Sequence, residues 1–161
     1  MPLLLSLLFF ATAPFYDGEL VQAQIGNSPK LELEVVTKQK SIVRGLSYRN
    51  QIGHDGMLFV YKEPQIYRFW MKQMHFDLDI IWIRDRIVVD ITHNAKAPQP
   101  SQKNLPLYQS KAPVNMILEV EAGRAAAWGI KVGSFLTILI QAQNENLGQR
   151  ESSRDRSIPR L

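Results

Sequence analysis

The centre of the chain is a series of short apolar runs with the two-residue period of β-strands. Residues 31–36 alternate apolar and acidic side chains, as a strand does when one of its faces meets water. Residues 78–83 and 87–91 are two further apolar runs, and only the polar turn 84–86 separates them. This spacing predicts an antiparallel hairpin. A chain that buries its apolar residues in this way folds around a sheet.

More strands and two short helices complete the predicted domain. Strands are expected at 56–61, 67–71, 116–120 and 135–140, and helices at 38–47 and 124–128. Four prolines between 94 and 113 predict a long ordered loop over the sheet. The predicted fold is therefore mainly β, a compact antiparallel sandwich or barrel-like sheet with two short helices, in one domain over residues 31–140.

The segments on either side of this domain have different compositions. Residues 3–13 form an apolar run of the length of a signal-peptide core, too short to span a bilayer. Small residues precede two candidate cleavage sites, after Ala13 and after Ala23, and Pro14 makes the first a poor site. We therefore expect 1–23 to be a signal peptide, or an uncleaved hydrophobic anchor because no Lys or Arg precedes the run. Residues 24–30 are expected to be a linker, and the polar tail 141–161 to be disordered.

This N-terminal segment predicts an exported protein, periplasmic or extracellular. The only membrane contact expected is through the segment itself, if it stays uncleaved. The alternative is an N-terminal segment buried in the fold.

Composition excludes several classes of protein. The 161 residues, 45% hydrophobic, suffice for one globular core. The absence of cysteine excludes disulfides, thiolate nucleophiles and structural zinc ribbons. The formal net charge is +4, of which the last dozen residues carry +2, so the folded body is nearly balanced. Its basic residues are interspersed with acids, and no nucleic-acid partner is expected.

Several short motifs, in order, carry a resemblance to a known family. They are Arg44-Gly-Leu-Ser-Tyr-Arg49, Gly56-Met-Leu-Phe59, Phe69-Trp-Met-Lys72, Leu78-Asp-Ile80, Leu118-Glu-Val120 and Gly129-Ile-Lys-Val-Gly133. Over roughly residues 31–140 the chain resembles the domain of unknown function 192 family, also called uncharacterised protein family 0127. The resemblance implies a compact, mainly β domain, frequently behind an export signal, without an established reaction. Two positions depart from the family pattern: Gln73 replaces the usual asparagine and Asp77 the usual proline.

The block from Phe69 to Asp79 places charged side chains among apolar residues. If the block folds inward, these charges need partners. The resemblance suggests that the charged candidates are recurring family positions. The predicted ligand-binding residues are Arg44, Arg49, Trp70, Lys72, Asp79 and Glu119. Lys72 and an arginine would meet beside Trp70, with a carboxylate orienting them, and hold an anionic or carbohydrate-like ligand. The alternative is structural: ion pairs would fasten a helix to the sheet, and Trp70 would be core.

Two functional hypotheses follow. The first is a noncatalytic module of the cell envelope that binds an unknown small ligand or an envelope protein. The second is an enzyme acting on an anionic or glycan substrate, with Asp79 or Glu119 as general base beside Lys72.

No serine lies in a nucleophile elbow, and no glycine-rich loop could cradle phosphate. No cofactor is predicted. Nor is a metal, because a polar strand face explains the two-residue spacing of His75, Asp77 and Asp79 as well as a metal site does. The oligomeric state is not predicted.

Overall fold

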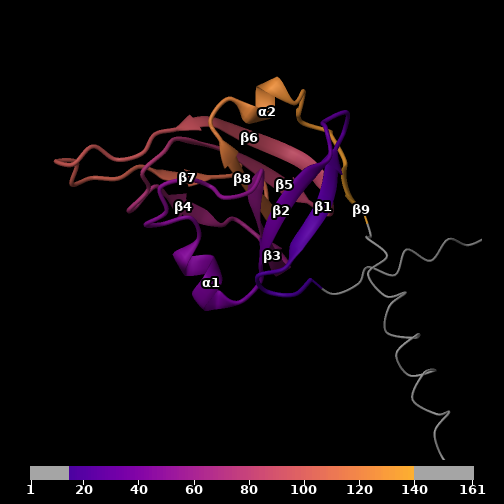
Figure 1. Ribbon diagram of the computed structural model, residues 1–161, viewed down its shortest axis with the longest axis horizontal. Helices are drawn as coiled ribbons and strands as arrows, with labels where there is room; N and C mark the ends of the chain where they lie inside the picture. The colour runs from indigo at the N-terminus through magenta and orange to yellow at the C-terminus, as the bar shows by residue number, and fades with distance from the viewer. Residues whose placement is uncertain (1–14, 140–161) are drawn as a thin grey trace, which may run out of the picture.

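Two sheets and two short helices make up the described part of the chain, residues 15–139 of a computed structural model (Figure 1). Seven strands form the main sheet, in the order β6-β5-β8-β3-β2-β1-β9. Their bounds are β1 Leu20–Ile25, β2 Leu31–Val36, β3 Gly56–Gln65, β5 Leu78–Arg84, β6 Ile87–Ala95, β8 Val114–Glu121 and β9 Leu136–Leu139. A small second sheet pairs β4 (Arg68–Trp70) with β7 (Leu107–Gln109). The helices are α1 (Gln39–Arg44) and α2 (Arg124–Ala127).

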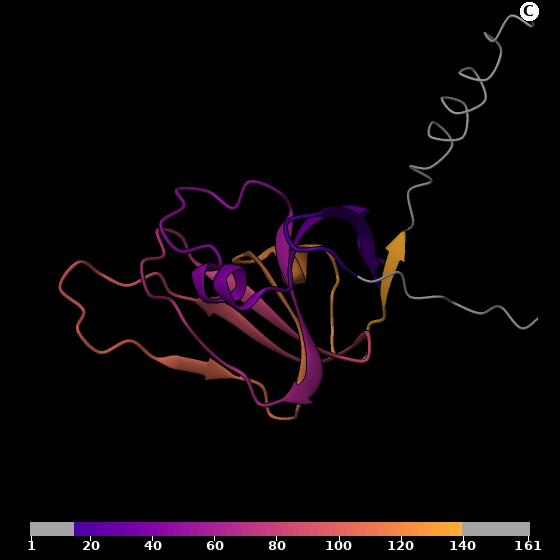
Figure 2. The ribbon, with the colours of Figure 1, turned by 90° about the horizontal axis from the view of Figure 1, so that it is seen from below.

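The predicted fold class is confirmed, and the barrel-like form describes it best. The main sheet curls into a half-barrel (Figure 2). Its neighbouring strands are antiparallel except β2 and β3, which run parallel because the chain crosses over through α1 between them. The expected hairpin is present, with Ile83 opposite Val88 and Arg84 opposite Ile87. Neither helix between residues 15 and 139 has the length and apolarity needed to cross a bilayer.

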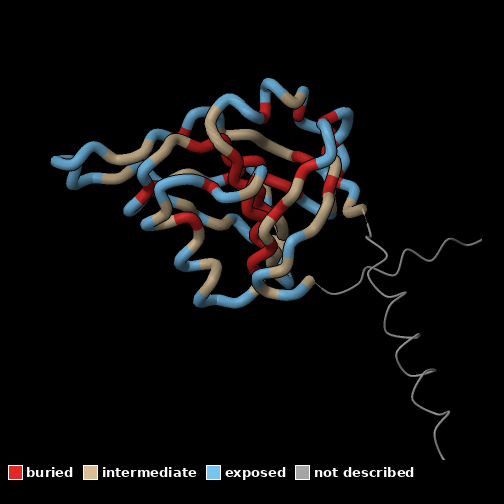
Figure 3. Tube along the Cα trace, viewed as in Figure 1, coloured by how far each residue is buried: buried red, intermediate tan, exposed pale blue. Residues whose placement is uncertain are grey.

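Both faces of the central strands are buried, which the tube in Figure 3 shows as a red centre. Successive side chains of a strand point to opposite faces. In β5, Ile81 and Ile83 pack into one apolar cluster, and Ile80 and Trp82 into a second cluster on the other face. The second face carries α1 (Figure 1). Side chains on this face also line a cavity.

The sheet begins earlier than the predicted domain boundary at residue 31. Residues 20–25 are the strand β1, which lies between β2 and β9, and this differs from the predicted linker at 24–30. Ala23 and Ile25 are completely buried. The apolar and polar residues of 21–25 alternate as in a strand, but the small side chain of Ala23 also fits a cleavage site. The apolar run 3–13 and the tail 141–161 lie outside the described residues.

Candidate functional site

A cavity of about 520 Å³ lies between α1 and one face of the sheet. Aromatic and aliphatic side chains form most of its wall, and a single carboxylic acid belongs to it. The lining residues are Gln39, Ile42, Val43, Arg44, Gly45, Leu46, Ser47, Phe59, Tyr61, Tyr67, Arg68, Phe69, Trp70, Met74 and Glu119. Such a composition, apolar walls with a few polar groups, is typical of small-molecule sites.

The aromatic wall follows from the period of β3 and from the packing of β4. Phe59 and Tyr61 are two residues apart in β3, so both face the cavity side of the sheet. The ring of Phe69 is nearly perpendicular to two other rings, and its centroid lies 5.1 Å from that of Phe59 and 5.8 Å from that of Trp82. The rings of Tyr61 and Tyr67 are stacked at a centroid distance of 3.7 Å. These contacts attach β4 to the main sheet and fix the positions of the rings.

The opposite wall is α1, a helix of six residues that needs support from outside itself. Asp17 supplies it: one carboxylate oxygen accepts the backbone N–H groups of Thr37 and Lys38, at 2.9 and 3.0 Å, and the other accepts the Ser41 hydroxyl at 2.7 Å. These hydrogen bonds lower the pKa of Asp17 to about 2. At the other end of the helix, Gly45 has φ +47°, and a Cβ there would lie 3.3 Å from the Phe59 ring. Glycine thus allows the turn to pack against the aromatic wall.

Glu119 is the buried acid of the cavity. It lies on β8 opposite Met57 of β3 and Ile80 of β5, and only 6% of the residue is exposed. Among residues 15–139 its carboxylate has no hydrogen-bond or ion-pair partner. Its oxygens are not sealed inside the protein, which agrees with the place of Glu119 in the cavity lining. Burial without a partner raises its pKa to about 8, so the folded protein holds the group in its neutral form at neutral pH.

Asp79 is also buried, 1% exposed, but on the other face of the sheet. It is opposite Val120 in the β5–β8 register, whereas Glu119 is opposite Ile80, and residues paired across strands share a face. Its oxygens accept three backbone N–H groups, from Asn94 at 2.9 Å, Gly123 at 2.9 Å and Ala125 at 3.1 Å. Asp79 therefore fastens the end of β6 and the start of α2 to the sheet.

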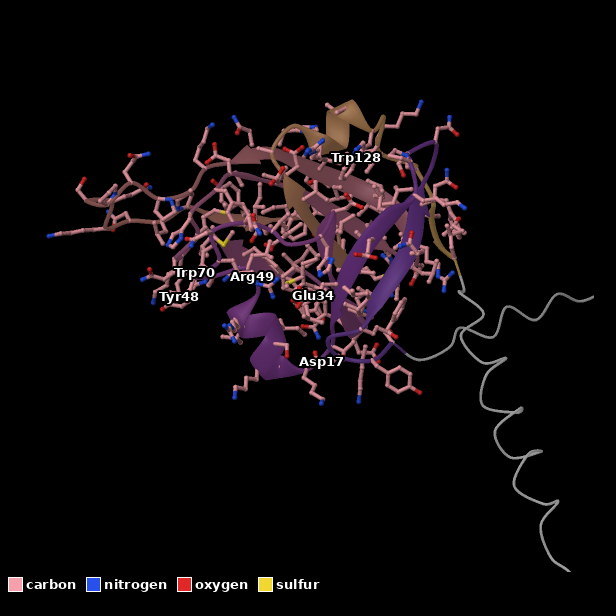
Figure 4. All side chains as sticks on the ribbon, in the orientation of Figure 1. Asp17, Glu34, Tyr48, Arg49, Trp70 and Trp128 are labelled. Carbon is pink, nitrogen blue, oxygen red and sulfur yellow. The ribbon has the colours of Figure 1, made fainter. Side chains whose placement is uncertain are left out.

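The other predicted site residues divide between the cavity and its surroundings. Arg44 and Trp70 line the cavity, and Trp70 is 55% exposed rather than core (Figure 4). Arg49 makes a bidentate ion pair with Glu34 of β2, at 2.7 and 2.9 Å. Lys72 does not line the cavity, and its Nζ lies 5.1 Å from the centroid of the Trp70 ring.

Three of the six predicted residues therefore share the cavity: Arg44, Trp70 and Glu119. Arg49, Lys72 and Asp79 lie elsewhere, and the predicted meeting of Lys72 with Asp79 or Glu119 is not present. Sequence reasoning missed Tyr61 and Tyr67. The alternation of Met57, Phe59 and Tyr61 could have predicted the position of Tyr61, because it places three large side chains on one face of the strand.

The two departures from the family pattern have local structural roles. Gln73 has φ +59°, a left-handed conformation that asparagine adopts more readily than glutamine. Asp77 accepts hydrogen bonds from Lys96 Nζ at 2.7 Å and from the Ala97 N–H at 2.8 Å, which lower its pKa. The nearby His75 is instead bonded to Asn50 at 2.9 Å. Within residues 15–139, no group of three His, Asp or Glu side chains is arranged to hold a metal ion.

Comparison with known proteins identifies relatives of unestablished function. The model of the DUF192 family, described as "Uncharacterized ACR", matches residues 21–138. A protein from Sinorhizobium meliloti 1021, provisionally described as a transcription regulator, has a solved structure that is 25% identical with a TM-score of 0.66, covering 78% of this chain and 98% of its own. A protein of unknown function from Novosphingobium aromaticivorans DSM 12444 is 27% identical with a TM-score of 0.62, covering 73% and 84%. No curated protein matches the chain.

Replacing Asp79 tests its structural role. In Asp79→Asn, one acceptor oxygen becomes an NH₂ group that faces backbone donors, so we expect the free energy of unfolding to fall by about 2–4 kcal/mol. Urea denaturation measures this change. The control is Asp85→Asn at an exposed turn, which should change stability by less than about 0.5 kcal/mol. A stable Asp79→Asn protein would show that the three backbone contacts contribute little.

The pKa of Glu119 predicts how stability depends on pH. The folded pKa of about 8 lies above the ordinary value of 4.5, so the folded state binds more protons between these values and stability falls as pH rises. Glu119→Gln removes this titration. Between pH 5 and pH 8, the wild type should lose roughly 3 kcal/mol relative to the variant in parallel urea titrations. Equal slopes for the two proteins would mean that Glu119 ionises normally.

Proposed function

We propose that this chain, which belongs to the DUF192 family, is a noncatalytic domain that binds a small ligand in the cavity beneath α1. One observation carries the proposal: a buried acid without a partner in residues 15–139 is part of a cavity whose other walls are mainly aromatic and aliphatic. Packing alone does not require such an acid, since burying it without a partner costs free energy. A ligand that pairs with this acid would offset that cost.

The size and wall of the cavity support a small molecule as the occupant. About 520 Å³ lies within the range of 300–1,000 Å³ usual for ligand sites. Exposed residues such as Val43 and Arg44 belong to the lining, so the cavity has a mouth at the surface. The rigid rings inside lose little conformational freedom when a ligand binds, which favours affinity.

The enzyme hypothesis has less support from this arrangement. It needs Lys72 beside a general base, but Lys72 lies outside the cavity and Asp79 is on the opposite face. Glu119 is the one carboxylic acid among the described lining residues. Glycoside hydrolysis generally uses two carboxyl groups with different roles. A noncatalytic ligand therefore fits these side chains better than a glycan substrate does.

Export to the cell envelope is the second part of the proposal. The apolar run 3–13 supports it. Cleavage after Ala23 would divide β1 and remove Asp17, whereas cleavage after Ala13 would leave the whole sheet and the support of α1. This difference favours the earlier site in spite of Pro14.

A bulky residue at the mouth tests the cavity as the binding site. Val43, 70% exposed, belongs to the lining, and Val43→Trp should reduce binding of cavity ligands at least tenfold without unfolding the protein. Ligands can come from a fragment library screened by chemical-shift changes in ¹H–¹⁵N spectra. Dissociation constants for the best fragments are then compared between the variant and wild type.

The matched control is Val132→Trp, a second exposed valine, 62% exposed and not among the cavity residues. It should bind every fragment as the wild type does. Fragments that bind equally well to both variants would show that the cavity is not the binding site. A library without any binder would count against the ligand-binding function itself.

The proposed export is tested by the mass of the mature protein. Expressed from its own start codon in a bacterial host, the chain should be recovered outside the cytoplasm with Pro14 as its first residue. Recovery of the full-length chain in the cytoplasm would contradict export. A mature chain that starts at Gln24 would contradict the earlier site.

A further inference from the structure

We infer that the cavity ligand is an organic ammonium ion, with the Glu119 carboxylate as its counter-ion and the rings of Tyr61 and Tyr67 against its apolar groups. The inference rests on the proposed function, because it specifies the chemistry of the ligand for the same cavity. Its support comes from the burial of the acid, the nature of the wall and the position of the neighbouring cations.

The first support is the missing partner of Glu119. Other buried or half-buried acids of this domain are satisfied by the protein: Asp79 by three backbone N–H groups and Glu34 by Arg49. Glu119 is 6% exposed, and the described residues provide it neither a donor nor an ion pair. A cationic ligand would supply the missing charge in a site of low dielectric, where an ion pair is strong.

The second support is the aromatic wall. Five of the lining residues are aromatic: Phe59, Tyr61, Tyr67, Phe69 and Trp70. The faces of aromatic rings attract cations, and rings around a carboxylate are suited to an ammonium ion with apolar substituents. The same wall already attracts a cation from outside, since the Lys72 Nζ lies 5.1 Å from the Trp70 ring centroid.

Neutral and anionic ligands fit less well. A neutral ligand could accept a hydrogen bond from the protonated acid but would not use the charge of the carboxylate. An anion would lie beside a group that becomes negative when it ionises. Arg44 and Arg68, both exposed, are the other charged side chains among the lining residues, and water and salt screen them. They favour a ligand whose outer end is neutral or negative, and they do not neutralise Glu119.

Two compounds of nearly equal shape separate charge from size. Choline carries a trimethylammonium group, and 3,3-dimethyl-1-butanol has a carbon atom in place of the nitrogen. We expect choline to bind the full-length protein at least tenfold more tightly at pH 8.5, measured by titrations in ¹H–¹⁵N spectra. In Glu119→Gln this preference should fall to threefold or less.

A second pair of variants keeps the test informative if Glu119→Gln fails to fold. Tyr67→Leu removes a ring of the cavity wall and should weaken choline binding three- to tenfold. The control is Tyr16→Leu, at a tyrosine that is 66% exposed and does not line the cavity. It should leave the affinity unchanged.

The pH dependence supplies an independent test. Below a pKa of about 8, Glu119 must lose a proton before it can pair with the cation, so choline affinity should fall about fivefold from pH 8 to pH 7 and about tenfold from pH 7 to pH 6. Choline's quaternary nitrogen does not titrate. Tyr61 and Tyr67, with raised pKa values, stay neutral in this range, and arginines keep their charge. The residues paired with Glu119 across β3 and β5, Met57 and Ile80, carry no charge.

The outcomes distinguish this inference from the proposed function. Equal binding of the two compounds, or no binding of choline at 100 mM, would overturn the ammonium inference. If library fragments still bind the wild type and lose affinity in Val43→Trp, the cavity remains a ligand site for another class of compound. If Val43→Trp affects no ligand, both proposals fail.

Discussion

The burial of both faces of the central strands is the constraint on which the rest of this structure depends. Strands β3, β5 and β8 have apolar clusters on either side, so a charge on one of their buried residues leaves water. Such a charge is either satisfied by the protein or changes its protonation state. Asp79 and Glu119 show the two solutions on adjacent strands: three backbone donors hold the first, and burial raises the pKa of the second to about 8.

The register of β5 and β8 places these two acids on opposite faces of the sheet, where they have different contacts. Because Asp79 pairs with Val120 and Glu119 with Ile80, the carboxyl groups project from opposite faces. Asp79 stabilises the turn into α2, where Gly123 and Ala125 donate to it. Glu119 belongs to the cavity beneath α1. A catalytic pair of these two acids is therefore excluded by strand pairing.

Local patterns predicted most of the fold, and contacts between distant residues decided the site. The alternation of residues 31–36 and the polar turn 84–86 were sufficient to predict the strand at 31–36 and the two strands of the hairpin. β1 was missed because its residues also fit a cleavage site, and its burial depends on pairing with β9 far along the chain. Arg44, Trp70 and Glu119 were predicted and share the cavity, whereas Lys72 does not line it. No local pattern separates the predicted residues that line the cavity from Lys72, because pairing with distant strands decides where each side chain lies.

Asp17 connects the beginning of the domain to the cavity. Its carboxylate holds the first turn of α1 through Thr37, Lys38 and Ser41, although it precedes the whole sheet in the chain. A helix of six residues has little stability of its own. The wall of the cavity therefore depends on a residue that lies outside the sheet and precedes its first strand. Proteolysis after Asp17 would remove these hydrogen bonds and loosen the wall of the cavity while leaving every strand intact. Under the proposed ligand-binding function, such trimming would shorten the time for which a ligand is retained.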